Sequence, residues 1–133
     1  MSKITELTAQ KRNAVAGPLL GTIFNIFEAW DISNPEQCVL LGINNEGTFY
    51  NWKKKPESAT ISHDLLERTS YILGIWKALQ ILIPENRISD SWVKSPNSDP
   101  AFNGQSPIER MLGGQVVDLA HVRQYLDSVR GGW

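Results

Sequence analysis

The sequence has little of what secreted, membrane-spanning or metal-binding proteins need. Its 133 residues contain one cysteine, Cys38, which excludes an internal disulfide and fits a reducing cytoplasm. No charged segment followed by an apolar one opens the chain, so we expect no signal peptide. The longest apolar stretch is too short, and too closely flanked by charge, for a bilayer span of about 20 residues. Neither histidine lies near Cys38 in sequence, so no metal site is expected.

A surplus of either charge is also missing. Thirteen basic and fourteen acidic residues give a net charge of −1, whereas nucleic-acid-binding domains usually carry a basic excess. A local basic cluster can still act within a neutral chain. The length suits one compact domain, or two small helical subdomains that share a core. Five tryptophans are many for this length, and we expect some of them to face a partner.

The residue groupings that carry catalysis are missing too. An enzyme needs a nucleophile beside a base, a carboxylate pair, a metal cluster or a phosphate-binding loop. The segment GPLLG at residues 17–21 lacks the Lys-Ser/Thr pair of a P-loop. We interpret His63 and His121 as capping or surface residues and Cys38 as a small core residue. We therefore expect no enzyme, no cofactor and no small-molecule substrate.

The chain does contain helix signals, arranged around residues 62–84, SHDLLERTSYILGIWKALQILIP. Ser62 is a helix cap, Asp64 lies in the first turn and Pro84 ends the segment. A helix that is apolar around most of its circumference must be covered on several sides. The pattern predicts a central helix that is packed by its neighbours or by a second copy. We expect a homodimer whose seam includes Tyr71, Ile75 and Trp76.

Three helices are predicted before this central one. Pro18 opens a helix over residues 18–30, and Asn34 caps a short helix that ends at Gly42. The turn GINNEG leads to a second short helix, TFYNWKKK at residues 48–55, which Pro56 ends. Two short helices joined by a glycine-containing turn are typical of a helix-turn-helix.

In a helix-turn-helix, the second helix offers side chains to base edges while basic residues hold phosphates. Asparagine pairs with adenine and lysine contacts phosphate. In the alternative interpretation, NNEG is a simple turn, KKK is a solvated helix end favoured by the dipole, and Glu46 has the wrong sign for a phosphate contact. The DNA-facing candidates are Asn44, Asn45, Thr48, Tyr50, Asn51, Lys53 and Lys54.

Three further helices are predicted after Pro84. Residues 85–96 form a short helix with Ile88, Trp92 and Val93 on one face, and Phe102 anchors the loop that follows. Ser106 begins a capped helix that ends at two glycines. The tail RGGW is either a disordered end or a segment that inserts into a partner. The final helix, at residues 115–130, has an apolar face of Val116, Leu119, Val122, Leu126 and Val129.

These segments together resemble one protein family. Residues 17–84 look like the Xre-like helix-turn-helix half of the MbcA/ParS/Xre antitoxins. Residues 91–133 resemble the C-terminal toxin-binding domain of that family, with its Trp-led helix, its "PN…F.G.SP…ML.G" loop and helix, and its RGGW-type tail. The likeness is more specific in this second half. The turn NNEG departs from the usual pattern by one additional residue and by Glu46.

The resemblance implies the antitoxin of a bacterial type II toxin–antitoxin pair. The usual toxin is a RES-domain enzyme that consumes NAD, and such antitoxins dimerise, block the enzyme and often repress their own operon. Carried over by position, the toxin-facing candidates are Trp92, Asn97, Phe102, Gly104, Ser106, Pro107, Arg110, Arg123, Tyr125, Arg130, Gly131, Gly132 and Trp133.

The sequence therefore predicts an all-α fold in three parts. Residues 1–16 are a polar extension, residues 17–84 hold the helix-turn-helix and the central helix, and residues 85–133 form the toxin-binding domain. The expected partners are a RES-domain toxin, operator DNA and a second copy of the chain. The alternative is a helix-turn-helix transcription regulator that has no toxin partner, and an enzyme with an unrecognised site is a third, less favoured interpretation.

Overall fold

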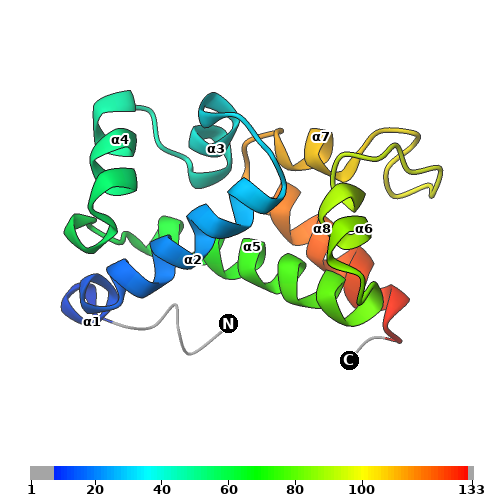
Figure 1. Cartoon of the computed structure of the whole chain (residues 1–133), viewed down its shortest axis with the longest axis horizontal. Helices are drawn as coiled ribbons and strands as arrows, with labels where there is room; N and C mark the ends of the chain where they lie inside the picture. Colours follow the sequence, from blue (N-terminus) through cyan, green and yellow to red (C-terminus); the bar gives the residue numbers. More distant parts are fainter. Residues whose placement is uncertain (1–7, 132–133) are drawn as a thin grey trace.

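The computed structural model describes residues 8–131. This part of the chain contains α-helices, one short 3-10 helix and no strand, which confirms the predicted all-α class. Helices α2 and α5 cross the molecule, with α3, α4 and α7 above them in Figure 1. The elements are α1 (Ala9–Ala14), α2 (Ala16–Ala29), α3 (Asn34–Leu41), α4 (Glu46–Lys54), η2 (Pro56–Ser58), α5 (His63–Leu82), α6 (Asn86–Trp92), α7 (Pro107–Met111) and α8 (Val116–Val129).

Helix α5 is the central helix that the sequence predicts. The Ser62 hydroxyl accepts a hydrogen bond from the Leu65 N–H at 3.0 Å and so caps it. Helices α2, α3, α6 and α8 all pack against α5, so its apolar circumference is covered from several directions. No helix among the described residues is long and apolar enough to cross a membrane.

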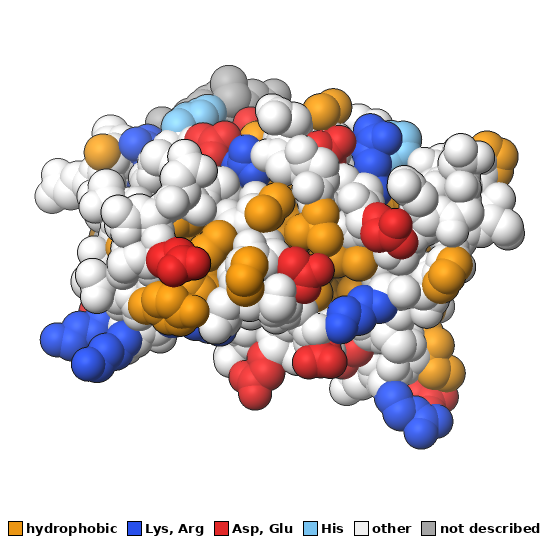
Figure 2. Space-filling model, turned by 90° about the horizontal axis from the view of Figure 1, so that it is seen from above, with side chains coloured by type: hydrophobic (Ala, Val, Ile, Leu, Met, Phe, Trp, Pro, Cys, Tyr) orange, Lys and Arg blue, Asp and Glu red, His pale blue; other side chains and the backbone are white. Residues whose placement is uncertain are grey.

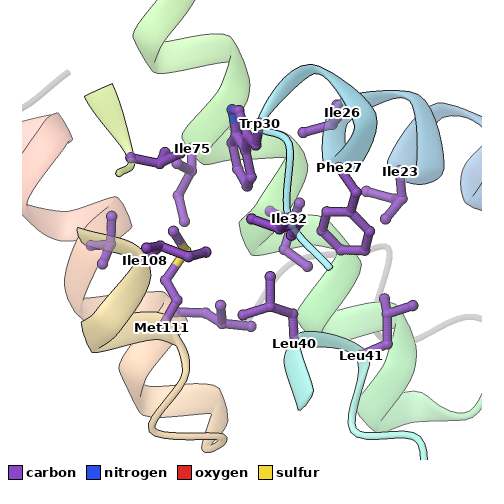
Figure 3. Close-up of a cluster of buried hydrophobic side chains, with 14 of the residues drawn as sticks. Ile23, Ile26, Phe27, Trp30, Ile32, Leu40, Leu41, Ile75, Ile108 and Met111 are labelled. Atoms are coloured by element: carbon purple, nitrogen blue, oxygen red, sulfur yellow. The ribbon is translucent and has the colours of Figure 1, made fainter. Parts of the chain in front are cut away.

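One hydrophobic core joins the two halves of the chain. Figure 3 shows Trp30, at the end of α2, close to Ile75 of α5, with Ile108 and Met111 of α7 nearby. Ile75 is 0% exposed in this cluster. Its side chain therefore lies inside one chain, because segments on both sides of α5 in sequence already cover this face. Its role in a dimer stays a prediction.

Arg68 is a buried charged residue that connects the two halves. Its guanidinium donates to the Gly114 carbonyl at 3.0 Å and lies 3.4 Å from the carbonyls of Val39 and Leu40. Asp64 accepts from its Nε at 2.8 Å. The side chain thus supplies hydrogen-bond donors to carbonyls in the last turn of α3, which lack partners within the helix. It also holds the turn between α7 and α8.

The N-terminal segment is partly built into the fold. Helix α1 begins after Thr8, whose side chain accepts from the Lys11 N–H. Arg12 Nε donates to the Ile61 carbonyl at 2.8 Å, and Asn13 Oδ1 accepts from the Ile61 N–H at 2.7 Å. This segment therefore holds the connection that leads into α5. Residues 1–7 lie outside the described part of the chain.

Several helix starts differ from the sequence prediction. Helix α2 begins two residues before Pro18, which takes the third helical position, where an N–H would have no partner within the helix. Ser33 rather than Asn34 caps α3, because Ser33 and Glu36 form a reciprocal capping box. Helix α4 begins at Glu46, inside the predicted turn, because the Asn45 side chain caps it.

Two residues on the predicted apolar helix faces are not buried. Ile88 of α6 is 47% exposed, and the neighbouring Ser89 is buried instead, held by hydrogen bonds to Gln80 and to the Asn86 carbonyl. Val129 is 53% exposed because it lies in the last turn of α8, beyond the end of the core. Leu119, Val122 and Leu126 form the buried face of α8, as predicted.

Replacing Arg68 with methionine should destabilise the whole chain. Methionine keeps a flexible stem but donates no hydrogen bond, so the carbonyls of Val39, Leu40 and Gly114 lose a donor. Because each buried unsatisfied acceptor costs about 1–3 kcal/mol, we expect the free energy of unfolding to fall by about 2–4 kcal/mol in urea denaturation.

Arg87→Met is the matched control for this experiment. The Arg87 side chain is 90% exposed and lies 3.9 Å from Glu85, so its loss should change stability by less than about 0.5 kcal/mol. Equal stabilities of the two variants would contradict the connecting role of Arg68.

Candidate interaction surfaces

Four rings from three segments meet at one side of the C-terminal half. Trp92 of α6 stacks on Tyr125 of α8, with ring centroids 6.2 Å apart and planes inclined by 16°. Phe102, in the loop before α7, meets both rings edge-on at 6.0 and 4.9 Å. His121 completes the group at 6.3 Å from Phe102. We refer to Trp92, Phe102, His121 and Tyr125 as the aromatic cluster.

The loop between α6 and α7 is closed by its own hydrogen bonds. The Asn97 N–H donates to the Gln105 carbonyl at 3.0 Å, and the Gly104 N–H donates back to the Asn97 carbonyl at 2.9 Å. Gly104 has φ +86°, a conformation that favours glycine. The Asn97 side chain also accepts from the Asp99 N–H. Asn97 and Gly104 thus hold the loop in one conformation.

Several residues predicted to face a toxin are instead buried supports. Phe102 is 2% exposed and anchors the loop, as its hydrophobic character predicts. Ser106 is 4% exposed and caps α7 in a reciprocal pair with Glu109. Pro107 is buried at the first position of α7. The fold of the chain already uses these three side chains, and their role in contacting a toxin stays a prediction.

The predicted arginines do not gather with the aromatic cluster. Arg123 lies two positions before Tyr125 on α8, so the two side chains point to different sides of the helix. Arg123 pairs with Asp127 at 3.0 Å and crosses α5 at Gly74, where any Cβ would collide with its guanidinium. Arg110 pairs with Asp118 at 3.3 Å, at the start of α8.

The predicted tail falls largely beyond the structure. Arg130 follows α8 directly and its N–H donates to the Leu126 carbonyl. Gly131 has φ +90° and turns the chain away from the helix. Gly132 and Trp133 lie outside the described residues, so their roles stay a prediction.

A hollow of about 410 Å³ opens beside the aromatic cluster. Asp99 and Ala101 of the loop line one side, and α8 lines the other with side chains that include Gln124 and Tyr125. The sequence prediction missed this site apart from Tyr125. A signal was present, since four polar or aromatic residues recur at helical spacing along one face of α8: His121, Gln124, Tyr125 and Ser128.

The helix-turn-helix consists of α3 and α4, separated by residues 42–45. Gly42 ends α3 with φ +68°, and a Cβ there would lie 2.9 Å from Arg68 Nε. Asn45 Oδ1 accepts from the Thr48 N–H at 3.1 Å, so this oxygen is used as a cap. Asn44 and Asn51, the other asparagines predicted to read bases in this motif, are exposed and cap no helix among the described residues.

A polar network joins the two helices of this motif. Asn34 of α3 accepts from Lys53 Nζ at 3.0 Å and contacts the Tyr50 hydroxyl at 3.5 Å. Lys53 Nζ also lies 5.6 Å from the Phe24 ring centroid and 5.4 Å from that of Phe49. Lys53 is therefore engaged within the fold, whereas Lys54 points into solvent.

The face that carries these helices is mixed in charge. Figure 2 shows hydrophobic side chains across its middle with carboxylates among them, and basic side chains both between these and at the lower corners. Hydrogen bonds from Ser33 hold the pKa of Glu36 below its ordinary value, so this residue stays negative at the start of α3. Glu46 is exposed at the start of α4. Phosphate contacts on this face therefore depend on a few lysines.

The two remaining dimer candidates are half-buried. Tyr71 and Trp76 lie on α5, and Trp76 lines a groove of about 400 Å³ between α2, α5 and α6. Their role in a dimer stays a prediction. Within residues 8–131, no group of three histidine, cysteine or acidic side chains could hold a metal ion. Cys38 is half-buried, and burial raises the pKa of its thiol above the ordinary value.

Comparison with known proteins agrees with this division into two functional surfaces. Residues 9–74 match the antitoxin Xre-like helix-turn-helix domain, and residues 78–132 match the antitoxin Xre/MbcA/ParS C-terminal toxin-binding domain. The aromatic cluster and the hollow both lie in the second range. The chain is also 44% identical, over 113 residues, to the "Uncharacterized protein y4oB" of Sinorhizobium fredii (strain NBRC 101917 / NGR234), covering 85% of this chain and 84% of that one. Because the two family models together match most of its length, the chain belongs to the Xre/MbcA/ParS family of antitoxins.

Proposed function

We propose that this chain neutralises a RES-domain toxin that consumes NAD, by covering the active site of that enzyme. The observation that carries the proposal is the aromatic cluster, which lies within the matched toxin-binding domain and leaves Trp92 and Tyr125 half-exposed. Aromatic side chains at the centre of an interface commonly supply most of the binding energy. The family resemblance of the C-terminal half supports a RES-domain enzyme as the toxin.

Rigidity of this surface favours tight binding. The loop that carries Phe102 is closed by hydrogen bonds, and α7 is capped by the Ser106–Glu109 pair. Arg68 and Gly74 fix the turn before α8 and the position of α8 against α5. A surface that is ordered before binding loses little conformational entropy when the toxin docks.

The tail supplies a second means of inhibition in this proposal. Residues 130–133, RGGW, place an arginine and a tryptophan beside glycines that permit close backbone approach. An NAD-binding cleft carries polar or cationic groups for the pyrophosphate. The tail would enter this cleft while the aromatic cluster holds the body of the antitoxin against the toxin.

Repression of its own operon is the second activity that we propose. The support is the matched helix-turn-helix domain, in which α4 presents Asn51 and Lys54 to solvent. Phosphate contacts from Lys54 would position α4, and Asn51 would read a base edge. The alternative, a regulator without a toxin partner, does not explain why Trp92 and Tyr125 are left half-exposed in the aromatic cluster.

Co-expression with the protein encoded by the adjacent gene tests the toxin-binding function. We expect the neighbour to deplete cellular NAD when it is expressed alone, and this chain to restore the NAD content and co-purify with it. Trp92→Ala should weaken the rescue, because it removes half of the stacked ring pair. Trp52→Ala, on α4 in the other half of the chain, is the control. A neighbour that neither consumes NAD nor co-purifies would contradict the proposal.

Removing residues 131–133 tests the tail separately. We expect the truncated chain still to bind the toxin through the aromatic cluster. The antitoxin concentration needed to inhibit NAD consumption should rise at least about tenfold, because the contacts of the tail are lost. A tenfold change in affinity corresponds to about 1.4 kcal/mol. Inhibition assays at increasing antitoxin concentration measure this difference. If inhibition by the truncated chain is undiminished, the tail does not enter the active site and the body of the domain blocks access alone.

Lys54→Ala tests operator binding. If Lys54 contacts a phosphate, binding to the promoter DNA of its own operon should weaken for every sequence, and the slope of log K against log salt should flatten by about 0.9 between about 50 and 200 mM salt. Lys77→Ala on α5 is the control, because this exposed lysine lies far from α4 in sequence and on another helix. Identical slopes for both variants would indicate that Lys54 contacts no phosphate and that the lysine run is only the solvated end of α4.

A further inference from the structure

From the hollow beside the aromatic cluster we infer a specific recognition site: it receives a cationic side chain, arginine or lysine, of the toxin. This inference rests on the proposed function, since it names the chemistry by which the toxin is recognised. The hollow has a volume of about 410 Å³, which accommodates one long side chain. Six of its lining residues carry the argument: Asp99, Ala101, His121, Gln124, Tyr125 and Ser128.

The charge of the lining selects a cation. Asp99 contributes a carboxylate, and the residues that line the hollow include no lysine or arginine. One Asp99 oxygen accepts from the Ala101 N–H at 2.9 Å, which fixes the carboxylate in the loop and leaves its second oxygen able to accept from a ligand. A carboxylate held in this way is the partner that guanidinium and ammonium groups prefer.

Hydrogen-bond acceptors surround this carboxylate. The Ser128 hydroxyl donates its hydrogen to the Tyr125 carbonyl at 2.7 Å, so its lone pairs remain as acceptors. His121 Nε2 lies 3.1 Å from the Ala101 carbonyl, which can only accept, so Nε2 carries a hydrogen and holds the ring against the loop. Gln124 adds an amide carbonyl. An arginine side chain, with five N–H donors and no acceptor, complements such a lining.

The aromatic wall also favours a cation. Tyr125 lines the hollow and is held in place by Trp92 and Phe102, so its ring has a fixed orientation. Arginine stacks on aromatic rings, which adds contact area to the charge pair. An anionic or purely apolar ligand would gain nothing from Asp99. The toxin segment that enters the hollow therefore carries a positive charge.

Asp99→Asn is the sharpest test, because asparagine keeps the oxygen that accepts from Ala101 and loses only the charge. We expect the dissociation constant for the toxin to rise about tenfold and to depend less on salt concentration, as for a charge pair at an interface. Asp31→Asn is the matched control. Its side chain is 98% exposed, and neither Asp31 nor Lys94, whose Nζ lies 3.7 Å from it, lines the hollow. Its φ of 54° is one that asparagine tolerates.

Gln124→Lys tests the same hollow from α8, where the exposed position accepts a lysine without disturbing the core. The added cation should repel the toxin's cation and weaken binding by more than about tenfold, whereas Gln10→Lys on α1 adds the same charge elsewhere and should leave affinity unchanged. If Asp99→Asn lowers the melting temperature, the comparison of Gln124→Lys with Gln10→Lys tests the cation site instead.

The outcomes separate this inference from the proposed function. Wild-type binding with unchanged affinity in both Asp99→Asn and Gln124→Lys would overturn the cation site and leave the antitoxin function intact. Failure of the wild-type chain to bind the toxin would overturn both. A change in the oligomeric mass of Asp99→Asn without toxin, measured by sedimentation, would assign the hollow to a contact between two copies and also overturn the inference.

Discussion

The fold depends on one buried guanidinium. Arg68 of α5 donates to carbonyls at the end of α3 and to the Gly114 carbonyl in the turn before α8, so one side chain joins the helix-turn-helix to the toxin-binding domain. Burying a charge is costly unless it is paired and hydrogen-bonded, and here Asp64 and these carbonyls supply the partners. The two domains that the family models separate at residues 74 and 78 therefore share one core, and Arg68 adds a polar connection between them.

A second close contact determines what α8 can present. At Gly74 the absence of a side chain lets Arg123 cross α5, which fixes the rotation of α8 about its own axis. With the Arg123 side turned toward α5, the face that carries His121, Gln124 and Tyr125 is turned toward the loop and forms the hollow. The shape of this surface is thus a consequence of how α8 packs on α5. Residues buried within the chain, such as Gly74 and Phe102, contribute to that shape.

Local features of the fold could be predicted from the sequence, and long-range ones could not. Ser62, Gly42 and the Ser106–Glu109 box act within one helical turn, so their residue types and spacing suffice to identify them. The burial of Ile75 depends on which segments cover α5, and periodicity leaves that open. The same holds for the toxin-facing residues. The family pattern identifies Phe102 and Ser106 as important, but only their burial shows that they act as supports. The hollow arises where Asp99 meets α8, a contact that neither segment specifies alone.

The helix-turn-helix imposes a further physical constraint on DNA binding. Affinity for DNA comes largely from neutralised phosphates, and here Lys53 is held by Asn34 and two aromatic rings while Glu36 and Glu46 add negative charge to the same face. One chain therefore gains little from counterion release. Two copies held at the spacing of two half-sites would double these phosphate contacts. Because Ile75 is buried in the core, a seam on α5 would have to use the side chains that reach the surface, and among the predicted ones these are the half-exposed Tyr71 and Trp76.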